Sequence, residues 1–169
     1  MDPVTLLLDE ISSKFAGGPP GRAVLEAAAV RLLRFAQSSP PSRADCPEAG
    51  PGQEALYELG RHPVSGIALY LVSDAPGIVS APHEHRTWAV AVGLGGIEVN
   101  TLYRIRDAGA RTAAPGASRR IGPGDWIVML EDEVHATESL GPAPTYHLHL
   151  YGRALDSLPP FGTRTFRPV

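Results

Sequence analysis

The stretch Pro82-His83-Glu84-His85 carries two histidines one residue apart, and it lies among short segments in which apolar and polar residues alternate. Such alternation is typical of β-strands. Side chains two residues apart on a strand point to the same face, so His83 and His85 are predicted to lie side by side while Glu84 turns away. Two neighbouring imidazoles are suitable ligands for a metal ion.

A third histidine, His135, lies in another strand-like segment. Turn-forming residues at 122–125 and an apolar run at 126–130 precede it, as expected for a strand that folds back beside an earlier one. Such a strand would bring His135 next to His83 and His85. We therefore predict that these three histidines bind one metal ion inside a barrel.

The composition is that of an ordinary globular domain with a substantial core: 169 residues, 43% hydrophobic and 20% charged. The net charge is -3, and no basic run is present. Nucleic acid is therefore not expected as a partner, because phosphate binding needs a concentrated basic face. A membrane is not expected either, since no apolar stretch approaches the roughly 20 residues of a spanning helix.

The single cysteine, Cys46, excludes an intrachain disulfide. Residues 1–4 lack the basic segment of a secretory signal. A cytoplasmic protein is therefore expected. A barrel with open strand edges suits a monomer or a homodimer, and no residue specifies which.

Residues 1–52 are predicted to form helices and a loop that pack on the barrel. Apolar residues recur at helical spacing over 4–15 and again over 21–37. Residues 38–52 are rich in Pro, Ser and Gly and are predicted to be a connecting loop.

Residues 53–169 are predicted to form the barrel, and the whole chain one structural domain. Strand signals recur at short intervals over 66–152, with no long helical pattern between them, which indicates an antiparallel barrel or sandwich. The segment 54–59 is compatible with a further helix or with the first strand. The stretch 93–96 lacks the Lys-Ser/Thr of a phosphate loop and is predicted to be a hairpin turn.

The residues around the histidine pair resemble the first motif of the cupins, which runs glycine, five residues, HxH, three or four residues, glutamate, six residues, glycine. Gly77 stands six residues before His83, and Gly96 closes the motif at the expected distance. The glutamate position falls on Ala89. The fourth protein ligand common in cupins is therefore missing.

The second cupin motif runs glycine, five residues, PxGxxH, three residues, asparagine. Gly124 and His135 match it, whereas Leu130, Asp132 and Ser139 replace the proline, the glycine and the asparagine. This match is looser than the first.

Because it lacks this glutamate, the chain resembles one group within the cupins, the thiol dioxygenases. This group contains cysteine dioxygenase and 3-mercaptopropionate dioxygenase, which hold iron with three histidines. Members carry Ser-x-His-x-Tyr on a late strand. Here His149 and Tyr151 match that pattern, and His147 replaces the serine. The resemblance covers residues 57–153.

This resemblance implies a mainly β fold, the cupin double-stranded β-helix or jelly-roll barrel, with the N-terminal helices packed outside. It also implies an Fe(II)-dependent enzyme that converts a small thiol, 3-mercaptopropionate or cysteine, and O2 to the sulfinate. Three neutral imidazoles leave the full charge of Fe(II) to attract a thiolate. They also leave three of six octahedral positions open on one face for the substrate and O2.

The alternation over 147–151 puts His147, His149 and Tyr151 on one face of a strand. If that face is the barrel's interior, Tyr151 can reach the bound substrate or oxygen and His149 can orient its hydroxyl. His147 either continues this hydrogen-bond chain, as serine would, or is displaced into the metal site.

The substrate's charged end needs a partner, and family members use an arginine or glutamine near the start of an early strand, with a tyrosine nearby. The candidates here are Arg61 and Tyr57, with Arg153 as a rival. Two other functions remain open: a cupin that uses another divalent metal on a non-thiol substrate, and a non-catalytic cupin that binds a metal or small molecule.

Overall fold

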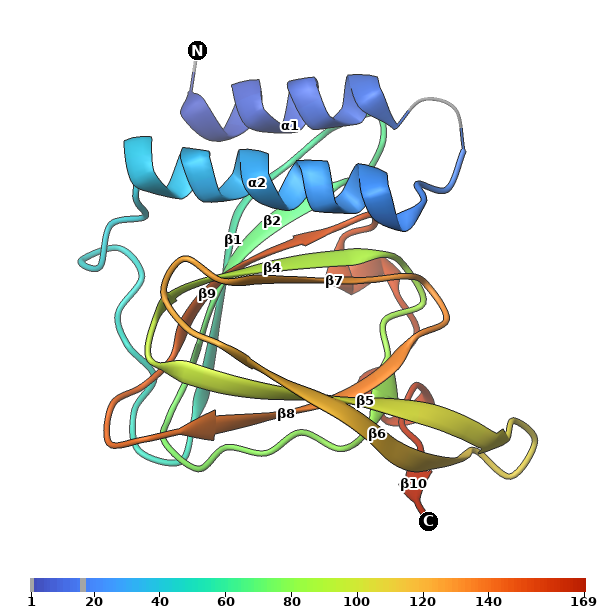
Figure 1. Ribbon diagram of the computed structural model, residues 1–169. Helices are drawn as coiled ribbons and strands as arrows, with labels where there is room; N and C mark the ends of the chain where they lie inside the picture. The colour runs from blue at the N-terminus through green and yellow to red at the C-terminus, as the bar shows by residue number, and fades with distance from the viewer. Residues whose placement is uncertain (1, 16–17) are drawn as a thin grey trace.

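Two curved five-stranded β-sheets face each other in this computed structural model, which describes residues 2–15 and 18–169 (Figure 1). The first sheet contains β1 Glu54–Arg61, β2 Ala68–Asp74, β9 Tyr146–Tyr151, β4 Ala89–Gly95 and β7 Trp126–Met129, in that order. The second contains β10 Arg167–Pro168, β6 Thr112–Ile121, β5 Ile97–Asp107, β8 Val134–Leu140 and β3 His83–Glu84. All neighbours are antiparallel except β10 and β6.

From β3 to β9, successive strands lie in alternate sheets, apart from the β5–β6 pair. This is the topology of a jelly-roll barrel, so the predicted mainly β jelly-roll fold is confirmed. The ambiguous segment 54–59 belongs to strand β1.

The prediction of a hairpin at 93–96 was wrong, because β4 and β5 belong to different sheets. Gly96 makes the sharp turn between them with a φ of 67°, and a Cβ there would lie 2.8 Å from the carbonyl oxygen of Pro144. Only glycine combines that conformation with so close an approach.

Two helices, α1 Pro3–Lys14 and α2 Arg22–Ser38, cover the outer face of the first sheet (Figure 1). They form where the sequence predicts them, because their apolar residues recur on one face. The buried residues are Leu7, Leu8 and Ile11 of α1 and Leu25, Ala28, Ala29, Leu32, Phe35 and Ala36 of α2. Among the described residues, neither helix is long and apolar enough to cross a membrane.

Side chains of strand β9 point alternately to the helix-covered face of the first sheet and to the barrel's interior. Leu148 and Leu150 belong to the apolar cluster beneath the helices, whereas Tyr151 belongs to a second cluster between the sheets. Side chains alternate along a strand, so His147 and His149 share the interior face with Tyr151. The chain continues from β9 through two short 3-10 helices, η1 Leu155–Ser157 and η2 Phe161–Thr163, and ends at β10.

Candidate metal centre

The three predicted ligand histidines meet where β3 pairs with β8. His83 and His135 are direct partners across these two strands, and His85 follows the end of β3. All three side chains are buried, and they offer ligand atoms that all lie within 4.8 Å of one another. The neighbouring strand thus brings the third imidazole to the pair, as the sequence predicts.

Two of these nitrogens are spaced as they would be around one bound metal ion. His135 Nε2 lies 3.3 Å from His85 Nε2. Two nitrogens at about 2.1 Å from one ion, at angles between tetrahedral and octahedral, lie about 3.0–3.4 Å apart. The residues present therefore fit a metal ion held by three imidazoles.

Hydrogen bonds set the tautomers of two of these rings. His83 Nδ1 lies 2.9 Å from the carbonyl oxygen of Ala81, and His135 Nδ1 lies 2.8 Å from Asn100 Oδ1. Each Nδ1 therefore donates its hydrogen, which leaves the Nε2 lone pair for a metal. The Nδ1 atom of His85 is buried and has no hydrogen-bond partner among the residues that the structure describes.

The three imidazoles are neutral near physiological pH. Burial is the main reason why the pKa of His83 is lowered and why the pKa of His85 lies well below its usual value. Burial, together with the nearby His83, also lowers the pKa of His135 to about 3. A neutral imidazole is the form that binds metals, so few protons compete with the ion.

Glu84, between the two predicted ligands His83 and His85, points away from them, as the sequence predicts. Its Oε1 atom lies 2.9 Å from Arg86 Nε and 3.0 Å from Arg111 Nη2. These ion pairs hold the back of the ligand segment. At the position of the missing motif glutamate, Ala89 is buried in the cluster that contains Tyr151. Among the described residues, the metal-binding group consists of the three histidines alone.

The histidines open into a cavity of about 470 Å³ between the two sheets. Its wall contains the predicted residues His149 and Tyr151 and one buried cation, Arg164. Acidic and apolar side chains complete the wall, among them Glu54, Asp74, Glu98, Leu56, Val72, Ile78 and Phe161. The cavity has room for a small substrate beside the imidazoles.

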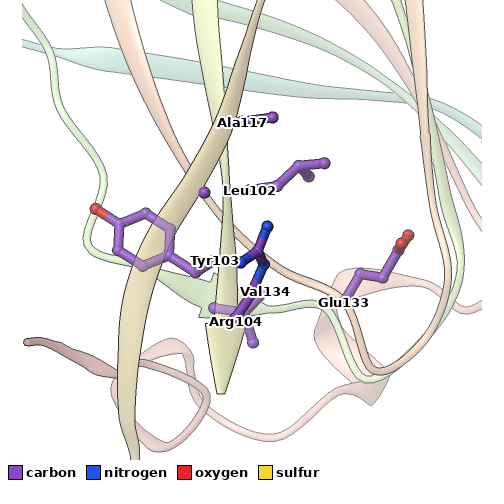
Figure 2. Close-up of a pocket in the computed structure, with 7 residues that line it drawn as sticks. Leu102, Tyr103, Arg104, Ala117, Glu133 and Val134 are labelled. Atoms are coloured by element: carbon purple, nitrogen blue, oxygen red, sulfur yellow. The ribbon is translucent and has the colours of Figure 1, made fainter. Parts of the chain in front are cut away.

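A second cavity, of about 250 Å³, lies at β5, β6 and the start of β8 (Figure 2). Its wall includes Leu102, Tyr103, Arg104, Ala117, Glu133 and Val134. It offers none of the three ligand histidines. The candidate metal site therefore lies in the cavity that contains the three histidines.

Tyr151 and His149 form a hydrogen-bonded pair in the cavity wall, with His149 Nδ1 2.9 Å from the Tyr151 hydroxyl. The rings of Tyr151 and His85 are 5.3 Å apart. Burial raises the pKa of Tyr151 far above its usual value and lowers the pKa of His149 to about 4. Both groups are therefore neutral near pH 7, and the phenol keeps its proton.

His147 lies deeper than the other two polar residues of β9. It is fully buried, does not line the cavity, and stacks on His149 with ring centres 6.0 Å apart. Its Nδ1 atom lies 3.5 Å from Glu98 Oε2. His147 is thus not a member of the three-histidine group, and its neighbour is a carboxylate.

The structure does not bring the three candidates for substrate binding to this cavity. Arg61 forms ion pairs with Glu58 and Asp156, at 2.7 and 2.9 Å. The Tyr57 hydroxyl donates to the carbonyl oxygen of Pro47 at 3.0 Å. Arg153 reaches the carbonyl oxygen of Ser157 at 3.4 Å, and none of the three lines the histidine cavity.

Arg164, which the sequence analysis missed, is the cation that does line it. The segment after η2 carries it inward, where it is 7% exposed. Its Nε donates to the carbonyl oxygen of Pro159 at 3.0 Å, and its Nη1 donates to that of Glu84 at 3.2 Å. Arg164 lies in an irregular segment, so no hydrophobic period in the sequence indicates its direction.

The metal-free protein is expected to lose stability as the pH falls from about 6.5 to about 4. The folded pKa values of His135 and His149 are about 3 and about 4, so in this window the unfolded chain takes up protons that the folded chain does not. Asp74 opposes the trend, because burial raises its pKa to about 6, but it is one group against several. Melting temperatures measured near pH 7, 6 and 5 should fall in that order. A melting temperature that stays constant or rises would contradict the lowered pKa values of the buried histidines.

No protein-family model matches the chain. Solved structures with a similar fold include KdgF from Halomonas sp., with 22% identity and a TM-score of 0.51 over 68% of this chain and 91% of that one. Oxalate oxidase in complex with the substrate analogue glycolate has 22% identity and a TM-score of 0.50, over 67% of this chain and 58% of that one. A cupin superfamily protein from Desulfitobacterium hafniense has 19% identity and a TM-score of 0.49, over 63% and 84%.

The jelly-roll barrel described above thus has the same fold as the barrels of KdgF and oxalate oxidase. The predicted likeness to the cupins is confirmed at the level of the fold. At these identities the comparisons show the fold and leave the reaction to the chemistry of the site.

Proposed function

We propose that the protein is an Fe(II)-dependent thiol dioxygenase that converts a small thiol, 3-mercaptopropionate or cysteine, and O2 to the sulfinate. The observation that carries this proposal is the ligand set: three buried neutral histidines, with an alanine where cupins commonly have a glutamate ligand. Such a site keeps the full positive charge of a divalent ion, which favours an anionic thiolate. Oxygen uptake that requires both Fe(II) and a thiol, with matching sulfinate, tests it.

The reaction balances without an external reductant. When bound, Fe(II) would supply the redox chemistry that joins O2 to sulfur. The substrate sulfur is oxidised, O2 is reduced, and both oxygen atoms end in the sulfinate. We further propose a cytoplasmic location, because a reducing compartment keeps small thiols available.

The Tyr151–His149 pair would control a proton beside the reacting groups. When His149 Nδ1 carries the hydrogen of their 2.9 Å contact, the phenol oxygen accepts it and the phenol proton is free for a ligand in the cavity. The raised pKa of Tyr151 keeps that proton in place near pH 7. In this role Tyr151 donates a hydrogen bond to the substrate or oxygen, and His149 orients the hydroxyl.

Arg164 is the residue we propose for the substrate carboxylate, in place of Arg61, Tyr57 or Arg153. It is buried and lines the histidine cavity, and its Nε and Nη1 donate to backbone carbonyl oxygens. Its Nη2 would therefore be the atom that donates a charge-assisted hydrogen bond to the substrate carboxylate.

Arg164→Gln should raise KM for 3-mercaptopropionate or cysteine by roughly 10- to 150-fold, the equivalent of losing about 1.5–3 kcal/mol from a hydrogen bond to a charged group. Turnover of cysteamine, which has no carboxylate, should change much less. Arg61→Gln is the matched control, because Arg61 lies outside the cavity. Equal KM changes for thiols with and without a carboxylate would refute the role of Arg164, provided that iron content is unchanged.

A further inference from the structure

Strand β5 gives its only two buried positions to polar residues. Glu98 is 3% exposed and Asn100 is 1% exposed, and the other residues of the strand are half-buried or exposed. Residues two apart on a strand share a face, so both point into the barrel. Polar groups at core positions destabilise a fold unless they are hydrogen-bonded, so these two side chains need partners inside the barrel.

A continuous chain of contacts runs from Glu98 to the metal centre. Asn100 Nδ2 donates to Glu98 Oε1 at 2.7 Å. Asn100 Oδ1 lies 2.8 Å from Nδ1 of the ligand His135. All members of this chain are buried.

The chemistry of Glu98 fixes the direction of every bond in the chain. An ionised carboxylate only accepts hydrogen bonds, so the amide nitrogen of Asn100 must face it. The amide oxygen of Asn100 then faces His135, and an oxygen acceptor there requires hydrogen on Nδ1. The lone pair of His135 is therefore on Nε2, 3.3 Å from His85 Nε2, where the metal ion would bind.

Glu98 stays ionised inside the barrel. Burial alone would raise its pKa, but the contact with His147 and the hydrogen bond from the amide of Asn100 outweigh burial and hold the pKa at about 2. His147 Nδ1 is 3.5 Å from Glu98 Oε2. Through this contact, His147, at the position where thiol dioxygenases have serine, is a neighbour of Glu98.

We infer that Glu98 and Asn100 are positioning residues that hold His135 in its metal-binding tautomer and supply a negative charge beyond the ligand. In cupins with the motif glutamate, the carboxylate would bind the metal directly from the position of Ala89. Here the charge would act through Asn100 and His135, and the position at the metal stays open for substrate. The inference rests on the metal site of the proposed function but not on the identity of the thiol.

Co²⁺ affinity, measured by competition with a chelator in the absence of thiol and O2, tests this inference. Loss of an outer partner of a metal-bound histidine typically weakens metal binding 10- to 100-fold. Asn100→Ala should fall in that range, and Glu98→Gln should weaken binding by about tenfold. The matched control is Asp74→Asn, which removes another buried carboxylate of the same cavity wall. Within the described part of the chain, Asp74 Oδ1 has no hydrogen-bond partner.

A swap of the two polar groups makes the test specific. In the double variant Glu98→Gln with Asn100→Asp, the new carboxylate accepts directly from His135 Nδ1 and the new amide donates to it. Co²⁺ affinity should recover most of the roughly 10- to 100-fold loss expected for a missing partner. A merely structural role predicts no such recovery, and the near-equal volumes keep the test valid if Asn100→Ala does not fold.

The inference is overturned if the double variant binds Co²⁺ as weakly as Asn100→Ala, or if Asp74→Asn weakens binding as much as Glu98→Gln. Failure here is separable from failure of the proposed function. If the wild type binds Co²⁺ and the variants show the expected order of affinities, but no thiol is oxidised, only the proposed reaction is refuted. Wild-type protein that binds no Co²⁺ would refute both.

Discussion

Replacing His135 by alanine is expected to remove nearly all bound iron and, with it, thiol oxidation. His135 is one of the three histidines of the proposed metal site, it lies opposite His83 across β3 and β8, and its Nε2 is 3.3 Å from that of His85. Loss of a ligand costs more than loss of a hydrogen-bond partner behind it, so Fe(II) affinity should fall by more than about 100-fold. Iron per chain after anaerobic reconstitution and desalting measures the effect.

The control for that experiment is His62→Ala. His62 is a histidine outside the metal group, with its Nδ1 2.9 Å from the Ser65 hydroxyl. This variant should keep one iron per chain. Full iron content together with full activity in His135→Ala would remove the basis of the metal assignment.

Tyr151→Phe is expected to keep iron and to lower kcat by roughly 10²- to 10⁴-fold, the usual range for a lost proton donor or acceptor. The ring still fills its place in the apolar cluster between the sheets, so the fold and the three histidines should be undisturbed. The hydroxyl that bonds His149 would be gone. Rates of sulfinate formation, normalised to iron, give the result.

Tyr70→Phe makes the same chemical change one ring away. The two tyrosine rings are 5.9 Å apart, but the Tyr70 hydroxyl bonds Glu58 and the backbone N–H of Leu155. This variant should lose some stability and keep its rate per iron. A Tyr151→Phe enzyme with a normal rate and normal coupling of O2 to sulfinate would make Tyr151 a structural residue.

The barrel and the histidine group could be predicted from the sequence because both depend on strand periodicity. Spacing of two residues puts His83 and His85 on one face, and turns at fixed intervals return the chain to bring His135 beside them. The same periodicity separates Leu148 and Leu150, which pack under the helices, from Tyr151 in the interior. Local pattern and tertiary structure agree at these positions.

The substrate end of the cavity could not be predicted in the same way. Arg164 reaches the cavity because the chain after β9 returns along β3, where Thr165 bridges His83. That path has no hydrophobic period to reveal it. Arg61, the candidate that the family resemblance suggested, is the last residue of β1, and its side chain forms ion pairs outside the cavity with Glu58 and Asp156.

Glu98 and Asn100 could not be predicted as site residues for a different reason. Alternating polar residues on a strand ordinarily indicate its solvent face, and these two occupy the buried face instead. Only their contacts with His135 and His147 reveal why polar residues stand at those core positions. Departures from the expected pattern are where function is most often found.

Oxygen consumption by anaerobically Fe(II)-loaded protein, with 3-mercaptopropionate, cysteine and cysteamine offered in parallel and sulfinate quantified, tests the central claim most directly. We expect uptake with a carboxylate-bearing thiol and one sulfinate formed for each O2 consumed. The absence of uptake with every thiol, from protein that holds one iron per chain, would contradict the assignment as a thiol dioxygenase.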